Sequence, residues 1–199
     1  MPLIIDKQTK EDARILIWKS EEPLDFFSKQ TLLTQSDYEK LEKYNSERRK
    51  MDLLVARFLL QKHCKNAIVA YLENGKPYLE NQYYKISISH SKDIVAVILH
   101  TNKDVSIDVE YIDNKIERLK TRFLSQFEIE QADSVEKQIL FWSAKETLFK
   151  IDHKQGFDIK TELSLNFHGD KLIGKIRNED KFDIEYQINS EWVLTYIVS

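Results

Sequence analysis

Polar and apolar residues alternate along several short stretches of the chain, and a period of two residues predicts strands whose two faces differ. The alternation is clearest over residues 85–89 and 106–111. Three short apolar runs earlier in the chain are also expected as strands, namely residues 14–18, 68–72 and 94–99. Ser89-His90-Ser91-Lys92-Asp93 is interpreted as a tight connection between two of these strands, and Asn74-Gly75-Lys76-Pro77 as a turn.

A helical period appears in three other regions. Ser36 and Glu39 have the spacing of a capping box before a helix that reaches about residue 44, and Ser46 is placed to cap a second, longer helix. Residues 114–151 are helical in pattern, with a capping box over 125–128. Within the last of these helices Phe141, Ala144 and Leu148 repeat at i, i+3 and i+7, so this stripe is expected to face a core.

Four further runs are expected as antiparallel strands, namely 163–167, 172–176, 182–188 and 192–198, with a turn at His168-Gly169-Asp170. Each half of the chain therefore combines helices with a small sheet. We expect an α+β protein of two similar lobes, residues 1–101 and 102–199.

Composition narrows the function classes. The 199 residues are 42% hydrophobic with a net charge of -3, which argues against a general nucleic-acid binder. Cys64 is the single cysteine, so no intrachain disulfide forms, and a buried thiol in a reducing cytoplasm is expected. No signal peptide is expected, since charge appears at Asp6, and no apolar run reaches the ~20 residues that span a membrane. Glycine-rich phosphate loops of the Walker and Rossmann kinds are absent.

Three carboxylates are candidates for a metal site. Asp108 and Glu110 are two apart in a strand, so both point to one face, while Ile107 and Val109 point to the other. An exposed strand face explains such a pair equally well. With Glu146 as a third ligand, the oxygen donors suit Mg²⁺, which usually takes phosphate as a co-ligand.

Glu146 and Lys150 lie one helical turn apart in Trp142-Ser143-Ala144-Lys145-Glu146-Thr147-Leu148-Phe149-Lys150. Taken alone, this spacing is typical of an exposed ion pair worth roughly 0.2–0.5 kcal/mol. Basic residues and serines occur elsewhere at positions that suit a phosphorylated substrate, although each also fits an ordinary surface or turn residue. These residues are Arg57, Lys76, Ser89 and His90.

The order of these motifs resembles that of the 4′-phosphopantetheinyl transferases. Over about residues 49–150, four motifs follow one another as in the two-lobed, surfactin-synthetase-activating group. They are Gly75-Lys76-Pro77, Ile88-Ser89-His90-Ser91, Ile107-Asp108-Val109-Glu110 and the motif of residues 142–150. The resemblance implies two α/β lobes in a pseudo-twofold arrangement with the active site where they meet. It also implies Mg²⁺-dependent transfer of phosphopantetheine from coenzyme A to a carrier-protein serine, with release of 3′,5′-ADP.

Residue roles follow from the same resemblance. Asp108, Glu110 and Glu146 would hold Mg²⁺, Lys150 would contact the coenzyme A phosphates, and Glu146 is our choice of general base, alone or through a metal-bound water. The expected coenzyme A contacts are Arg57, Lys76, Pro77, Ser89 and His90. The partner would be an apo acyl or peptidyl carrier protein, with no role for nucleic acid or membrane, and the enzyme is expected to be a cytoplasmic monomer.

The carrier would contact a segment that begins at Arg122. Phe123 and Leu124 are candidates for that contact, although both residues could equally well belong to the hydrophobic core. A basic patch of Lys115, Arg118, Lys120 and Arg122 would suit acidic carriers of fatty-acid, polyketide or peptide synthesis. Two residues depart from the family pattern, since Ser106 replaces a glycine and Thr147 a serine; neither removes a charge.

Three alternatives stay open at the level of sequence. An Mg²⁺-dependent phosphohydrolase would use the same three acids without a carrier protein. A non-catalytic module would bind coenzyme A only. A plain α+β interaction domain would carry the motifs by coincidence.

Overall fold

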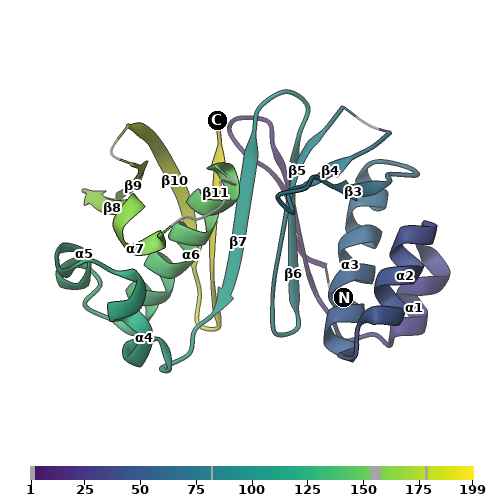
Figure 1. Cartoon of the computed structure of the whole chain (residues 1–199), viewed down its shortest axis with the longest axis horizontal. Coiled ribbons are helices and arrows are strands. Elements are labelled where there is room, and N and C mark those ends of the chain that lie inside the picture. Colours follow the sequence, from purple (N-terminus) through teal and green to yellow (C-terminus); the bar gives the residue numbers. More distant parts are fainter. Residues whose placement is uncertain (1–2, 82, 153–157, 178) are drawn as a thin grey trace. The chain divides into compact units, whose positions relative to one another are not determined.

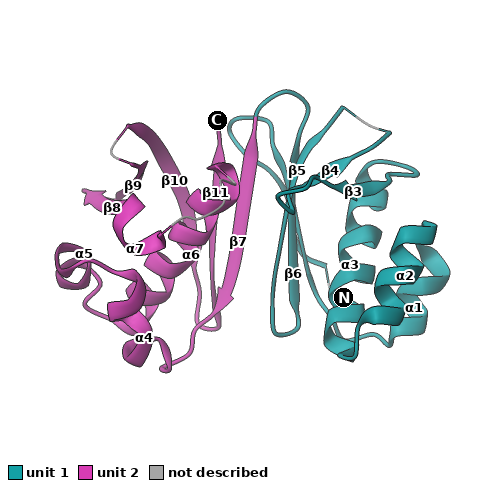
Figure 2. Ribbon diagram, in the orientation of Figure 1, with its two compact units in different colours: residues 1–103 teal, residues 104–199 magenta. Residues whose placement is uncertain are grey.

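The structure is a computed structural model that describes residues 3–81, 83–152, 158–177 and 179–199. It divides into two compact units, Met1–Lys103 and Asp104–Ser199 (Figure 2). The boundary expected from sequence lay two residues earlier. Within the described residues the chain is an α+β protein with seven helices and three antiparallel sheets.

The first unit is built on a four-stranded sheet in the order β1-β2-β6-β5. Its strands are β1 (Leu3–Gln8), β2 (Arg14–Lys19), β5 (Lys85–Ser91) and β6 (Ile94–His100). β6 is buried at every position, as expected for a central strand with apolar residues on both faces. A separate two-stranded ladder pairs β3 (Val69–Tyr71) with β4 (Pro77–Leu79) around the Gly75 turn.

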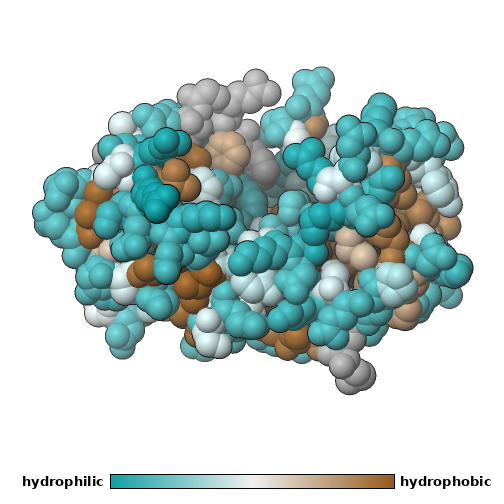
Figure 3. Space-filling model, turned by 90° about the horizontal axis from the view of Figure 1, so that it is seen from below, coloured by the Kyte–Doolittle hydropathy of each residue, from teal (hydrophilic) through white to brown (hydrophobic). Residues whose placement is uncertain are grey.

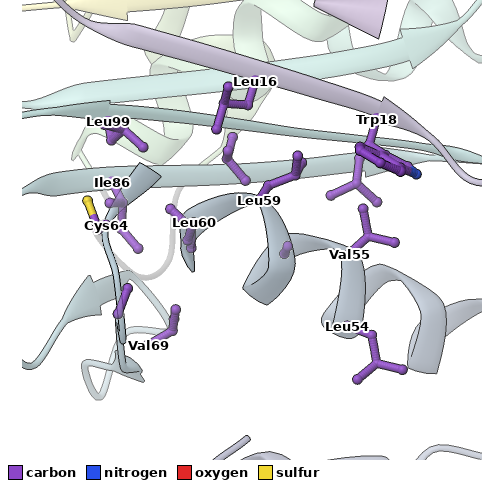
Figure 4. Close-up of a cluster of buried hydrophobic side chains, with 14 of the residues drawn as sticks. Leu16, Trp18, Leu54, Val55, Leu59, Leu60, Cys64, Val69, Ile86 and Leu99 are labelled. Atoms are coloured by element: carbon purple, nitrogen blue, oxygen red, sulfur yellow. The ribbon is translucent and has the colours of Figure 1, made fainter. Parts of the chain in front are cut away.

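Three helices cover one face of this sheet: α1 (Leu24–Gln30), α2 (Gln35–Lys43) and α3 (Glu47–His63). In Figure 1, α3 lies between the strands and the two shorter helices. Leu59 and Leu60 of α3 meet Leu16, Ile86 and other strand residues in one hydrophobic cluster, shown in Figure 4. Cys64 belongs to this cluster, and burial raises the pKa of its thiol, so the expected buried structural cysteine is confirmed.

The second unit has a five-stranded sheet in the order β7-β11-β10-β9-β8. Its strands are β7 (Val105–Tyr111), β8 (Leu163–His168), β9 (Lys171–Ile176), β10 (Asp180–Ile188) and β11 (Trp192–Val198). The long helix α6 (Val135–Asp152) packs across it, and Phe141, Ala144 and Leu148 are fully buried as the stripe predicts. Three short helices complete the unit: α4 (Ile116–Phe123), α5 (Gln126–Gln131) and α7 (Ile159–Glu162) (Figure 1).

Lys145 of α6 anchors the helix to its surroundings. Its ammonium is fully buried and donates to Glu128 Oε2 of α5 at 2.9 Å and to the carbonyls of Phe123, at 2.8 Å, and Leu163, at 3.0 Å. Burial lowers the pKa of Lys145, while the Glu128 carboxylate opposes that change. Glu128 in turn caps α5 and accepts from the Leu165 backbone, so one buried pair ties α4, α5, α6 and β8 together.

The sequence pattern predicts every strand of the second unit and the capping box of α5, and both are confirmed. The connection expected over residues 89–93 is wrong. β5 continues to Ser91, and only Lys92 and Asp93 form the turn to β6, with Lys92 at φ 46°. Ser89 and His90 are therefore strand residues on opposite faces of an edge strand rather than turn residues.

Two helix starts also differ from expectation. The capping box of α2 uses Thr34 and Asp37, not Ser36 and Glu39. Ser46 precedes α3 as expected but makes no side-chain capping bond. Elements that the pattern did not predict are β1, α1, β4 and α7.

No helix in the described part of the chain combines the length and the apolar character needed to cross a membrane. Hydrophilic residues cover most of the face seen in Figure 3, with smaller apolar areas between them.

Candidate functional site

The second unit brings three of the predicted site carboxylates to one region. Asp108 and Glu110 alternate with Ile107 and Val109 along β7, so the acids share one face of the strand. That face is the one covered by α6, since both carboxylates accept hydrogen bonds from α6 side chains. Glu146 lies on the same helix and faces the two acids closely enough for their charges to act on it.

Lys150 reaches across to β7. Its Nζ donates to Asp108 Oδ1 at 2.7 Å and to the Ile107 carbonyl at 3.1 Å. Asp108 is buried and Lys150 is about four-fifths buried, so this is a largely desolvated ion pair. Lys150 is thus engaged with the strand, and the exposed Glu146–Lys150 helix pair is not the arrangement that forms.

Trp142 is a site residue that the sequence analysis quoted but did not assign a role. Its indole Nε1 donates to Glu110 Oε1 at 3.1 Å. The Phe123 ring packs edge-on against the indole, with centroids 4.9 Å apart and an interplanar angle of 68°. Its position in the sequence could have indicated this role, because Trp142 precedes Glu146 by one turn of the same helix.

Glu146 has a strongly perturbed carboxyl group. Burial is the largest cause and, together with the neighbouring Asp108 and Glu110 carboxylates, raises the pKa of Glu146 to about 7, although the Lys150 ammonium acts in the opposite direction. A carboxyl with this pKa exchanges its proton near neutral pH, which is the property of a general base.

A buried hydroxyl cluster lies beside these groups, between α6 and β11. Thr195 Oγ1 is 2.8 Å from Ser143 Oγ and 2.7 Å from Thr147 Oγ1, and all three residues are fully buried. Thr195 is the direct register partner of Asp108. The threonine at position 147 therefore uses its hydroxyl in this cluster, as a serine could. Ser106 is accommodated in the extended strand β7 without a positive φ.

The donor chemistry of the three acids fits Mg²⁺. The donor atoms of all three residues are carboxylate oxygens. In addition to burial, the Asp108 and Glu110 carboxylates raise the pKa of Glu146, and a cation would relieve this repulsion. Among the residues that the structure describes, no three acidic, histidine or cysteine side chains are already arranged to hold a metal ion.

In the first unit, His90 contacts a buried acid that sequence reasoning did not single out. His90 Nδ1 lies 3.3 Å from Asp52 Oδ2, and Arg48 Nη2 lies 2.7 Å from Asp52 Oδ1. Burial raises the pKa of Asp52, with His90 and Arg48 acting against the rise. The His90 side chain is 55% exposed, so it remains accessible, whereas Ser89 on the opposite face of β5 is buried.

Arg57 does not have the role expected from the resemblance. The side chain is 1% exposed, and its Nε and Nη2 donate to Asp37 Oδ1 at 3.0 and 2.8 Å. The guanidinium also lies 3.4 Å from the hydroxyl of Tyr71 in β3, so it is buried and already has protein partners in place of a ligand. Arg57 is instead the link between α3 and the N-terminus of α2, which Asp37 caps.

Lys76 and Pro77 follow the turn glycine as predicted. Gly75 has φ 85°, a conformation that glycine adopts without steric cost, and Lys76 N donates to Asn74 Oδ1 at 3.1 Å. Pro77 begins β4. Both residues are half-buried at the tip of this small ladder.

Phe123 and Leu124 are core residues, so neither is placed to contact a partner. The exposed apolar side chains of this segment are Leu119 of α4 and Phe127 of α5, at 40% and 57% exposure. Lys115, Arg118 and Arg122 are exposed around them, and Lys120 is half-buried. The core position that the sequence left as an equal alternative for Phe123 and Leu124 is therefore confirmed.

The second unit thus brings together Asp108, Glu110, Glu146 and Lys150, whereas Lys76, Pro77, Ser89 and His90 belong to the first unit. A comparison with protein-family models and a search of curated proteins both return no match to this chain.

Proposed function

We propose that the protein transfers 4′-phosphopantetheine from coenzyme A to a serine of an apo carrier protein, in a reaction that requires Mg²⁺. The observation that carries this proposal is the convergence of Asp108, Glu110, Glu146 and Lys150 on one face of β7 and α6. The motif order along the chain supports the same reaction class.

In the proposed reaction the carrier serine oxygen forms a bond to the phosphorus that bears pantetheine. The bond between that phosphorus and the bridging oxygen breaks, and 3′,5′-ADP leaves with the electron pair. The serine proton passes to Glu146, directly or through a metal-bound water, since this carboxylate faces Asp108 and Glu110 from α6. Mg²⁺ held by the three carboxylates would neutralise pyrophosphate charge.

Lys150 contributes a second positive charge at the same place. Its ammonium already donates to Asp108, and an ammonium has three donor hydrogens, so it would donate to a phosphate oxygen while keeping that contact. In the first unit, His90, Lys76 and Pro77 are the proposed contacts to coenzyme A, whereas Ser89 is buried on the opposite face of β5 and is not retained. Arg57 is excluded from this set by its buried pair with Asp37.

The carrier is proposed to dock on α4 and α5. An exposed leucine and phenylalanine lie among basic residues there, which suits a partner with an acidic helix and an apolar anchor. Leu119 and Phe127 replace Phe123 and Leu124 as the proposed contact residues.

One assay tests the proposal. The protein is incubated with coenzyme A, Mg²⁺ and an apo carrier protein, and the carrier is weighed by mass spectrometry. A phosphopantetheine adduct that EDTA abolishes and that Glu146→Gln reduces supports the transferase. Asp133→Asn, which changes an exposed acid of the same unit, is the matched control and should leave the adduct intact.

Two other outcomes contradict the proposal in distinct ways. Release of inorganic phosphate from nucleotides in the absence of a carrier would indicate an Mg²⁺-dependent phosphohydrolase. Coenzyme A binding with no adduct across fatty-acid, polyketide and peptide carriers would indicate a binding module.

A further inference from the structure

The hydrogen bond between Trp142 and Glu110 joins the long helix of the second unit to one of the three site carboxylates. The indole Nε1 lies 3.1 Å from Glu110 Oε1. Indole is a donor only and carries no charge. It therefore fixes one carboxylate oxygen without neutralising the carboxylate, in contrast to the ammonium that pairs with Asp108.

Both ends of this hydrogen bond are held in place. The backbone of Glu110 is fixed by its register partner Val193 in the sheet. The Trp142 indole is packed edge-on against Phe123, a buried residue of the same core. A half-buried indole confined in this way has little rotamer freedom. Its hydrogen bond therefore orients the Glu110 carboxylate on a backbone that the sheet holds in place.

We propose that Trp142 is a positioning residue, which orients the Glu110 carboxylate for a divalent cation. This inference rests on the proposed function for the identity of the cation. An ionised carboxylate has about four lone-pair sites on its two oxygens, so a hydrogen bond from Trp142 to one oxygen does not by itself block an ion. Donors of this kind around metal ligands typically change metal affinity by about 10- to 100-fold when they are removed.

The chain offers a matched control. Trp18 Nε1 donates to Glu22 Oε2 at 3.2 Å in the first unit, so it forms the same chemical pair within the unit that does not contain Asp108 and Glu110. Trp142→Phe and Trp18→Phe each remove one indole donor from one glutamate. A second variant replaces Trp142 with benzothienylalanine, which keeps the size of the ring and lacks only the N–H donor.

The experiment measures Mg²⁺ affinity by calorimetry and the Mg²⁺ dependence of transfer, on full-length protein whose thermal unfolding is recorded in parallel. Both Trp142 variants should bind Mg²⁺ at least tenfold more weakly, as expected for a lost donor around a ligand. Their kcat at saturating Mg²⁺ should stay within about threefold of the parent. Trp18→Phe should leave Mg²⁺ affinity unchanged.

Wild-type Mg²⁺ affinity in the benzothienylalanine variant would overturn the inference, because the N–H donor would then have no role. If the parent binds Mg²⁺ and the Trp142 variants lose affinity but no carrier is modified, the inference stands and the transferase proposal fails. If the parent transfers phosphopantetheine and the Trp142 variants bind Mg²⁺ as tightly as the parent does, the transferase proposal stands and the inference about Trp142 fails. No Mg²⁺ binding by the parent overturns both.

Discussion

Lys150 and Asp108 form an ion pair with 2.7 Å between Nζ and Oδ1, and this pair joins α6 to β7 beside two further carboxylates. An ammonium at this place offsets part of the negative charge of three acids. It therefore joins the helix to the strand, and under the proposed function it would also supply a positive charge to the coenzyme A phosphates.

Replacing Lys150 with Ala should weaken coenzyme A binding by about tenfold or more, because a charge-assisted contact is worth roughly 1.5–3 kcal/mol. Calorimetry with coenzyme A measures the effect. Lys137→Ala breaks an exposed i,i+4 pair with Asp133 on the same unit and is the control, which should bind as the parent does. Equal affinity in all three proteins would show that Lys150 is structural only.

Glu146 should make the free energy of unfolding depend on pH. Its folded pKa of about 7 exceeds the ordinary 4.5, so the folded state holds a proton that the unfolded state has lost. Stability should fall as pH rises from about 4.5 to 7 and then level off, by at most about 3 kcal/mol. Glu146→Gln removes this dependence, so it should be the more stable protein at pH 8 and equal to the parent at pH 4.5.

Urea unfolding at pH 4.5, 6 and 8 without Mg²⁺ tests this prediction. Glu136→Gln is a useful control on the same helix, because hydrogen bonds to the Glu136 carboxylate, the first of them from its own backbone N–H, lower its pKa. Glu136→Gln should therefore be less stable than the parent at pH 8, whereas Glu146→Gln should be more stable. A Glu146→Gln profile parallel to that of the parent would refute the assigned pKa.

The buried pair of Arg57 and Asp37 predicts a large cost in stability. Arg57→Met leaves the Asp37 carboxylate buried without its cation, which typically costs about 3–5 kcal/mol. Adding Asp37→Asn should recover part of that loss. Lys29→Ala, which breaks an exposed pair with Asp25, should cost no more than about 1 kcal/mol. If Arg57→Met changes the free energy of unfolding only slightly but binds coenzyme A poorly, the coenzyme A contact expected from the sequence would be supported instead.

Gly174 allows α6 to approach the sheet closely. A Cβ atom at this position would lie 2.7 Å from Leu148 Cδ1 and 2.8 Å from Ile184 Cδ1. Gly174→Ala should therefore destabilise the protein by about 1–3 kcal/mol through overpacking. Leu148→Ala should be less harmful in that background than alone, because it removes the clash.

Gly169 separates packing from backbone effects. It has φ 62°, and a Cβ atom added there would have nothing within 4 Å, so Gly169→Ala should cost about 1 kcal/mol from conformation alone. Its cost should not change in the Leu148→Ala background. Thermal unfolding of the two double variants distinguishes the two causes.

Local pattern predicted the elements that depend on neighbours in sequence. The five strands of the second unit, the α5 capping box and the buried stripe of α6 all follow from periods of two or 3.6 residues. The shared face of Asp108 and Glu110 followed from the same argument. These properties need no knowledge of distant contacts.

The errors lie where a distant partner decides. Arg57 looked like a free cation because Asp37, its partner, is twenty residues away and belongs to another helix. For Phe123 the sequence left a contact role and a core role open, and only the packing of its ring on Trp142 decides for the core. The 89–93 connection was wrong because Lys92 adopts a positive φ, which let β5 continue to Ser91. Strand β1 was overlooked since only its pairing with β2 identifies it.

The buried contacts of Lys145 have a consequence for the neighbouring residue. Since its ammonium is bonded to three different segments, α6 cannot turn about its own axis without breaking buried hydrogen bonds. The face of α6 on which Glu146 lies therefore keeps a fixed orientation toward β7. Substitutions on β7 can alter what Glu146 meets, yet they leave its direction unchanged, so the chemistry of this face can vary while the frame stays constant.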